Sequence, residues 1–173
     1  MKKTTCIVLG IILNWLFGVA LAADFTLTST AFSNNQRIPQ IYSCDGKDVS
    51  PDLTWKNAPV NTKSFALVLG SPDWSAGSVY LWLLYNIPPD VTKLEKGASK
   101  NLPDKVLVGM NWYDESSYRG PCPPDSLLHH YVFTLYALNA VLDLPDDASS
   151  DDLIAEIQNH TIKQVKLTGL YSH

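Results

Sequence analysis

The chain has 173 residues, of which 13 are basic and 17 acidic, and its formal net charge at pH 7 is −4. A net acidic chain without a basic cluster is a poor candidate for binding nucleic acid or anionic membrane surfaces. The length suits one domain with a sizeable hydrophobic core.

The first 22 residues have the pattern of a cleaved secretory signal peptide. Two lysines precede an apolar run at residues 6–21, which ends in the small-x-small sequence Ala20-Leu21-Ala22. The run is short for a membrane span, and nothing basic follows it. We therefore predict cleavage after Ala22, a mature domain at residues 23–173, export to the periplasm or the medium, and no stable membrane anchor.

Removal of this leader leaves 11 basic against 17 acidic residues, a net charge of −6, and two of the three cysteines. These are Cys44 and Cys122. In an exported protein an even pair favours one disulfide. Two buried free thiols are the alternative, because a sequence does not give the distance between the two residues.

Most of the predicted elements are short strands. In chain order they are Phe25–Thr30, Phe65–Gly70, Val79–Tyr85, Lys105–Met110, Tyr131–Leu138 and Lys163–Tyr171. The third is apolar on both alternating faces, which is typical of a central strand covered on both sides. Strict alternation puts Val79, Leu81, Leu83 and Tyr85 on one face and Tyr80, Trp82 and Leu84 on the other. This strand must stop at Pro88-Pro89, which cannot donate ladder hydrogen bonds.

One helix is predicted near the C-terminus, in the sequence SSDDLIAEIQNH. Ser149 is placed to cap it, and Asp151 and Asp152 lie where the helix dipole favours negative charge. Leu153 and Ile157 contribute to its apolar face. Many short strands with proline-rich turns and one late helix predict a mostly β protein, a β-sandwich with a small helical addition.

The sequence RGPCPPDSLLHHYVFTLYAL places a proline-rich turn before two histidines and an apolar strand. Alternation puts His129 and Tyr131 at the rim of the core and His130 on the opposite face. The turn at Gly120 offers backbone N–H groups in a shape that its prolines restrict. Since Asp73 ends another core strand, an acid, an imidazole and a phenol could converge on one small polar pocket. The alternative is that His129 and Tyr131 are structural core residues whose polar atoms form hydrogen bonds with carbonyl groups of nearby loops.

Five sequence blocks follow one another along the chain: YSCDGKDVSPDLTW, FALVLGSPD, WLLYNIP, YRGPCPPDSLLHHYVFTLYAL and KLTGLY. Together they resemble the phosphatidylethanolamine-binding proteins, in their bacterial Raf-kinase-inhibitor-like branch. The resemblance covers nearly all of residues 23–173. It implies a β-sandwich of two antiparallel sheets with peripheral helices, and a shallow pocket for phosphate-like or other small anions.

The resemblance also implies the positions of the pocket residues. They are Asp73, Trp82, Gly120, Pro121, His129 and Tyr131. Two positions depart from the family pattern, because its first acid is Ser71 here and its histidine is Leu81. The two departures predict a drier, less polar pocket that binds phosphate-type ligands poorly.

The favoured function is that of an exported, non-enzymatic binding protein for a small anionic or polar ligand such as a phospholipid headgroup, with no cofactor and no metal. The alternative is an inhibitor or interaction protein that acts on a protease, kinase or host protein through its rim loops, Trp74–Ser78 and Asn111–Tyr118. Trp112, Tyr113 and Tyr118 are of the types favoured in binding hot spots, unless these loops are tucked onto the sandwich.

Two further chemistries rank lower. A serine hydrolase could use Ser71 or Ser116 with His129 as base, but the chain has no Gly-x-Ser-x-Gly elbow. A metal site could combine Asp73, His129 and a cysteine. It is disfavoured because His129 and His130 face opposite ways on a strand and cannot both bind one ion.

Overall fold

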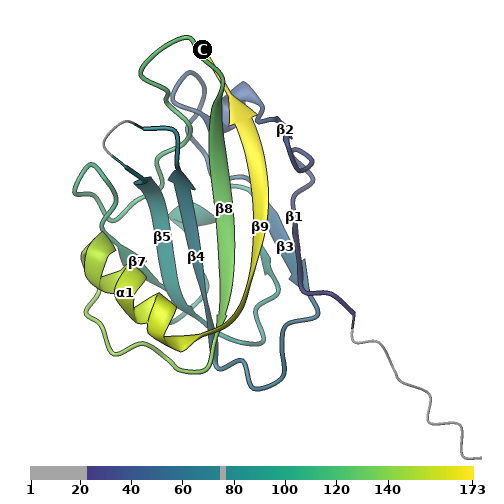
Figure 1. The fold of residues 1–173 in the computed structure, drawn as a ribbon, viewed down its shortest axis with the longest axis vertical. Coiled ribbons are helices and arrows are strands. Elements are labelled where there is room, and N and C mark those ends of the chain that lie inside the picture. Colours follow the sequence, from purple (N-terminus) through teal and green to yellow (C-terminus); the bar gives the residue numbers. More distant parts are fainter. Residues whose placement is uncertain (1–22, 75–76) are drawn as a thin grey trace, which may run out of the picture.

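The computed structural model describes residues 23–74 and 77–173, so the predicted leader lies outside the described residues. The described chain forms two packed β-sheets with one helix on the outer face of the larger sheet (Figure 1). Within the two described ranges, no helix combines the length and the apolar character needed to cross a membrane.

The smaller sheet has three antiparallel strands, in the order β1 (Thr26–Thr28), β3 (Leu53–Lys56) and β6 (Lys93–Leu94). The larger sheet has six, in the order β2 (Gln36–Arg37), β9 (Thr161–Tyr171), β8 (His129–Leu138), β4 (Ser64–Ser71), β5 (Val79–Ile87) and β7 (Leu107–Gly109). Only the β2–β9 pair among these is parallel. Two short 3-10 helices, η1 (Gln40–Tyr42) and η2 (Ala98–Lys100), lie in connections. The predicted two-sheet β-sandwich is confirmed.

The six predicted strands correspond to β1, β4, β5, β7, β8 and β9, and the predicted helix is α1 (Ser150–His160). As expected, β5 ends at Ile87, directly before the two prolines. The sequence did not predict β2, β3 and β6. Two of these have only two residues, too few for alternation to show.

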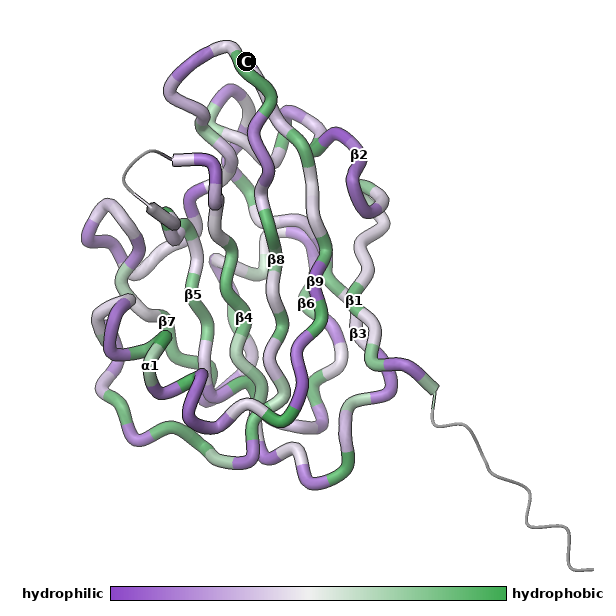
Figure 2. The backbone as a smooth tube through the Cα atoms, in the orientation of Figure 1, coloured by the Kyte–Doolittle hydropathy of each residue, from purple (hydrophilic) through white to green (hydrophobic). Residues whose placement is uncertain are grey.

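The main core lies between the two sheets. Trp55 of the smaller sheet packs edge-on against Phe65 of the larger sheet, with ring centroids 5.7 Å apart. Figure 2 shows hydrophobic residues along much of β4 and β5, in the middle of the larger sheet. Such strands are covered on both faces, because α1 packs on the side away from the smaller sheet.

The helix begins as its sequence predicts. The hydroxyl oxygen of Ser149 accepts a hydrogen bond from the backbone N–H of Asp152 (3.2 Å). Leu153 and Ile157 are fully buried in a second cluster against the larger sheet. This packing is close, since a Cβ on Gly109 would lie 2.7 Å from Leu153 Cδ2.

A β-bulge in β5 overturns the predicted faces of that strand. Tyr80 and Trp82 pair with consecutive residues of β4, so Leu81 is the extra residue between them. Leu81 and Trp82 therefore both belong to the core between the sheets, whereas Leu83 and Tyr85 pack toward α1. The prediction that Leu81 shares a face with Leu83 is wrong, because the bulge shifts the alternation by one residue.

Candidate functional site

The ends of β4 and β8 bring several predicted pocket residues to one end of the larger sheet. Because Gly70 pairs with Val132, Ser71 and Tyr131 are the next residues along the two neighbouring strands. His129 lies two residues before Tyr131 and so shares its face. Ser71, His129 and Tyr131 are all buried, with exposed fractions of 1%, 6% and 0%.

Each of these three side chains carries a buried polar atom without a hydrogen-bond partner. The atoms are Ser71 Oγ, His129 Nδ1 and Tyr131 Oη, and Trp74 Nε1, in the segment after β4, is a fourth. An unpaired buried polar atom costs roughly 1–3 kcal/mol, and native proteins contain few of them. Their concentration near the ends of two neighbouring strands therefore marks a candidate binding site.

The imidazole of His129 is oriented by a carboxylate. Its Nε2 lies 2.9 Å from Asp125 Oδ1, and this contact holds the pKa of Asp125 below its usual value. Because a carboxylate only accepts hydrogen bonds, Nε2 is the donor. A neutral His129 then presents Nδ1 as an acceptor, and protonation would turn it into a donor.

The phenol of Tyr131 is a neutral donor and acceptor. Burial raises its pKa well above the ordinary value, and the approaching backbone N–H of Cys122 only partly opposes this rise. The two groups do not reach hydrogen-bond geometry. Tyr131 therefore keeps its proton at physiological pH and can offer it to a ligand.

The carboxylate of Asp73 contacts the other histidine. Its Oδ2 accepts hydrogen bonds from the backbone N–H (2.6 Å) and the Nδ1 (2.8 Å) of His130. The prediction that His130 lies away from Asp73 is therefore wrong. Since Asp73 lies beyond the end of β4 and follows Pro72, strand alternation no longer fixes the direction of its side chain.

The proline-rich turn is fixed by its neighbours. The backbone N–H of Gly120 donates to Asp48 Oδ1 (2.7 Å), so this expected ligand donor is already engaged. A Cβ on Gly120 would overlap the carbonyl oxygen of Tyr42, so this packing requires glycine. The carbonyl oxygen of Pro121 accepts from the backbone N–H of Cys44 (3.1 Å).

The predicted disulfide between Cys44 and Cys122 is present and joins this turn to the loop after η1. A cavity of about 260 Å³ adjoins it, lined by Cys44, Asp48, Tyr113, Arg119, Gly120 and Cys122. His129 and Tyr131 do not line this cavity. Asp73, His129 and Tyr131 thus lie at one end of the sheet, whereas Gly120 lines the cavity that borders the turn.

Two predicted aromatic residues belong to the core. Trp82 is 1% exposed and packs edge-on against Tyr118, with ring centroids 5.3 Å apart. Tyr118, predicted as a contact residue of a rim loop, is itself buried and donates to the carbonyl oxygen of Tyr42 (2.8 Å). Trp112 and Tyr113 of the same loop are exposed, at 51% and 46%.

Comparison with known proteins agrees with this architecture. A family model described as phosphatidylethanolamine-binding protein matches residues 28–172. The chain belongs to the phosphatidylethanolamine-binding protein family. It is 42% identical over 147 residues to the UPF0098 protein of Methanothermobacter thermautotrophicus, covering 84% of this chain and 97% of that relative. The UPF0098 protein of Aquifex aeolicus is 34% identical over 166 residues, covering 94% and 96%.

Two solved structures of the family share the fold. Escherichia coli YbcL, described as a new member of the mammalian family, has a TM-score of 0.83 and 28% identity, and covers 87% of this chain and 99% of its own. A putative homologue from Chlamydia trachomatis has a TM-score of 0.78 and 34% identity, covering 86% and 97%. These family members support the fold and a binding role in general.

Sequence reasoning missed the polar partners of the site. Asp125 accepts a hydrogen bond from the ring of His129, and Asp73 accepts one from the ring of His130. Asp48 accepts a hydrogen bond from the backbone N–H of Gly120. Asp125 and Asp48 lie in loops, where no periodicity predicts which side chains meet. Only the position of Asp125 shortly before His129 gave a local signal.

Proposed function

We propose that this protein is an exported, non-enzymatic binding protein whose pocket, at the ends of β4 and β8, takes a small polar ligand of low charge. The unpartnered atoms Ser71 Oγ, His129 Nδ1 and Tyr131 Oη carry this proposal. Two hydroxyls and an imidazole acceptor suit a ligand that offers both a donor and an acceptor. A hydroxyl, an amide or a protonated phosphate ester has this character.

The surroundings of these atoms favour low ligand charge. The first acid and the histidine of the family pattern are replaced by Ser71 and Leu81, and Leu81 is buried in the core. In the adjoining cavity, the guanidinium of Arg119 is paired with Glu115 at 2.7 and 2.8 Å. A buried anion is stabilised best by an opposite charge, and the guanidinium of Arg119 is already engaged by Glu115.

Titration of phosphate and phosphoethanolamine tests this specificity. The matched variant is Ser71→Asp/Leu81→His, which restores both family residues. A charge-assisted hydrogen bond contributes about 1.5–3 kcal/mol, so the double variant should bind these probes roughly ten- to a hundredfold more tightly. If the wild type binds them as tightly as the folded double variant, the proposal of a low-charge pocket is refuted.

The contacts of His129 give no support to the serine-hydrolase alternative that uses Ser71. Ser71 Oγ and His129 Nδ1 each lack a partner, while His129 Nε2 faces Asp125. A serine nucleophile is recognised by a hydroxyl within hydrogen-bond reach of its base. These residues therefore do not form a nucleophile–base pair in this structure.

Export is supported by the leader sequence and by the disulfide, which suits an oxidising compartment. N-terminal sequencing of protein from the extracytoplasmic fraction should begin at Ala23. Protein that keeps Met1 and stays with the cytoplasmic fraction would contradict export.

A second candidate function is inhibition of a protein partner. The observation that favours it is the exposure of Trp112 and Tyr113, with the guanidinium of Arg119 over the Tyr113 ring at 5.7 Å. Inhibition assays against panels of proteases and protein kinases test it, with Trp112→Ala/Tyr113→Ala as the matched variant. Inhibition that survives this double substitution would exclude this surface.

A further inference from the structure

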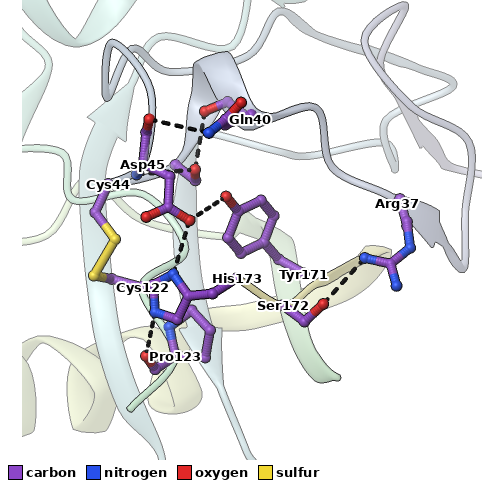
Figure 3. A network of polar contacts seen from close by, with 10 residues as sticks. Arg37, Gln40, Cys44, Asp45, Cys122, Pro123, Tyr171, Ser172 and His173 are labelled. Atoms are coloured by element: carbon purple, nitrogen blue, oxygen red, sulfur yellow. Dashed lines mark hydrogen bonds and ion pairs between the residues drawn. A yellow bond between two sulfur atoms is a disulfide. The ribbon is translucent and has the colours of Figure 1, made fainter. Parts of the chain in front are cut away.

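The last residue of the chain ties together the two loops that the disulfide joins (Figure 3). His173 Nδ1 lies 2.8 Å from Asp45 Oδ2, and His173 Nε2 lies 2.8 Å from the carbonyl oxygen of Pro123. Asp45 directly follows Cys44, and Pro123 directly follows Cys122. The imidazole therefore spans the two loops beside the covalent link.

These groups are of the kinds that bind zinc. Ligand atoms of Cys44, Asp45 and His173 all lie within 4.8 Å of one another, and Cys122 Sγ is bonded to Cys44 Sγ. A tetrahedral zinc site has metal–ligand bonds of about 2.0–2.3 Å, which puts its ligand atoms roughly 3–4 Å apart. In the disulfide neither sulfur is a thiolate, so the site is incomplete. Reduction would supply two thiols, which bind a metal as thiolates, beside a carboxylate and an imidazole.

The outer contacts of a zinc site are already present. Metal-binding histidines usually donate their second ring N–H to a carbonyl or a carboxylate. The Nε2 of His173 does so to Pro123, which leaves Nδ1 on the side of Asp45. The carboxylate of Asp45 also accepts a hydrogen bond from Tyr171 Oη (2.6 Å), which holds it in position.

The cluster is accessible, because Cys44, Asp45 and His173 are exposed. A reductant can therefore reach the disulfide, and a cation can reach the groups around it. Exposed disulfides are more often labile than buried structural ones.

We propose that Cys44, Cys122, Asp45 and His173 form a redox-gated zinc site, which opens when a dithiol reduces the disulfide. The dithiol gives two electrons and two protons to the disulfide and itself becomes a disulfide. Binding of Zn²⁺ then displaces both thiol protons and the proton on His173 Nδ1. The metal replaces the covalent link and keeps the two loops joined under reducing conditions. This site goes beyond the proposed binding function and does not depend on it.

The test uses purified protein in a Cys6→Ser background, so that only Cys44 and Cys122 can supply thiols. The protein is reduced with a phosphine, which avoids competing thiols, and is titrated with Co²⁺. One equivalent of Co²⁺ should produce a thiolate charge-transfer band and the visible bands of a tetrahedral site, and Zn²⁺ should displace it. The oxidised protein should show neither change.

His173→Ala keeps both thiols and should weaken Co²⁺ binding by at least about tenfold. His160→Ala, at the C-terminal end of α1, is the matched control and should leave binding unchanged. Zn²⁺ should raise the Tm of the reduced parent protein but not that of reduced His173→Ala.

Three results would overturn the proposal. They are the absence of the charge-transfer band after reduction, equal affinity in His173→Ala, and equal binding by the oxidised protein. A reduced chain that unfolds and stays unfolded when Zn²⁺ is added also overturns it, because thiols of an unfolded chain do not form this site.

Discussion

Two buried tyrosines, Tyr118 and Tyr131, differ in how their hydroxyls are hydrogen-bonded. Tyr118 Oη donates to the carbonyl oxygen of Tyr42 at 2.8 Å, whereas Tyr131 Oη has no partner. Their exposed fractions are similar, at 7% and 0%, so burial does not explain the difference. The contrast supports a structural role for the hydroxyl of Tyr118 and a binding role for that of Tyr131.

Replacing each tyrosine by phenylalanine should therefore have different effects on stability. Tyr118→Phe leaves the Tyr42 carbonyl unpaired and should lower the free energy of unfolding by about 1 kcal/mol. Tyr131→Phe removes an unpaired hydroxyl and should leave this free energy unchanged or raise it by up to about 1 kcal/mol. Urea unfolding measures both. Equal losses in the two variants would show that Tyr131 Oη is satisfied and would remove a main support for the pocket.

The contact between Asp73 and His130 predicts a pH dependence. Burial raises the pKa of Asp73, but hydrogen bonds from the backbone and ring of His130 outweigh it, so the pKa is lowered overall. The stabilisation is therefore present above the unfolded pKa of about 3.9 and is lost as the pH falls through the lower folded value.

Urea midpoints measured between pH 2 and pH 6 test this dependence. The difference between wild type and Asp73→Asn should be largest near pH 6 and should vanish at the acid end. Asp90→Asn, at an exposed position, is the control. A difference that stays constant over this range would show that the charge of Asp73 contributes nothing.

At the scale of the elements, length and regularity decide what the sequence predicts. Apolar patterns indicate β4, β5 and β8 because each is long enough to show them. The sequence pattern does not predict the bulge at Leu81 or the turn beyond Ser71, because both depend on how the strands pair in space. His129 and Tyr131 lie within one long strand, so alternation placed them correctly on one face. The contact between Asp73 and His130 joins the segment after β4 to β8, so the sequence did not predict it.

The start of α1 is a local feature, and the sequence predicts it fully. Ser149→Ala removes the acceptor for the backbone N–H of Asp152 and should lower the free energy of unfolding by about 1 kcal/mol. Ser149→Asn keeps a good capping residue and should cost only a few tenths of that. Chemical denaturation measures both, with Ser126→Ala in an exposed loop as the control. Equal losses for alanine and asparagine would show that capping is not the cause.

For the whole molecule, segments far apart in the sequence meet at one end of the sandwich. The loop after η1, the turn at Gly120 and the C-terminus are joined there by the disulfide and by the contacts of His173 (Figure 3). Cys44 and Cys122 are 78 residues apart. Closing so long a loop removes much conformational freedom from the unfolded chain.

Removing the disulfide should therefore destabilise the protein strongly. In a Cys6→Ser background, Cys44→Ser/Cys122→Ser should lower the free energy of unfolding by about 4 kcal/mol, less any strain in the native bond. Because this loss arises in the unfolded state, the effects of Tyr118→Phe and Tyr131→Phe should be the same with and without the disulfide. Urea unfolding of the combined variants measures this additivity. Thiol titration of the denatured, unreduced parent should find no free thiol. Two reactive thiols per chain, or a loss below about 1 kcal/mol, would show that the link contributes little to the stability of the protein.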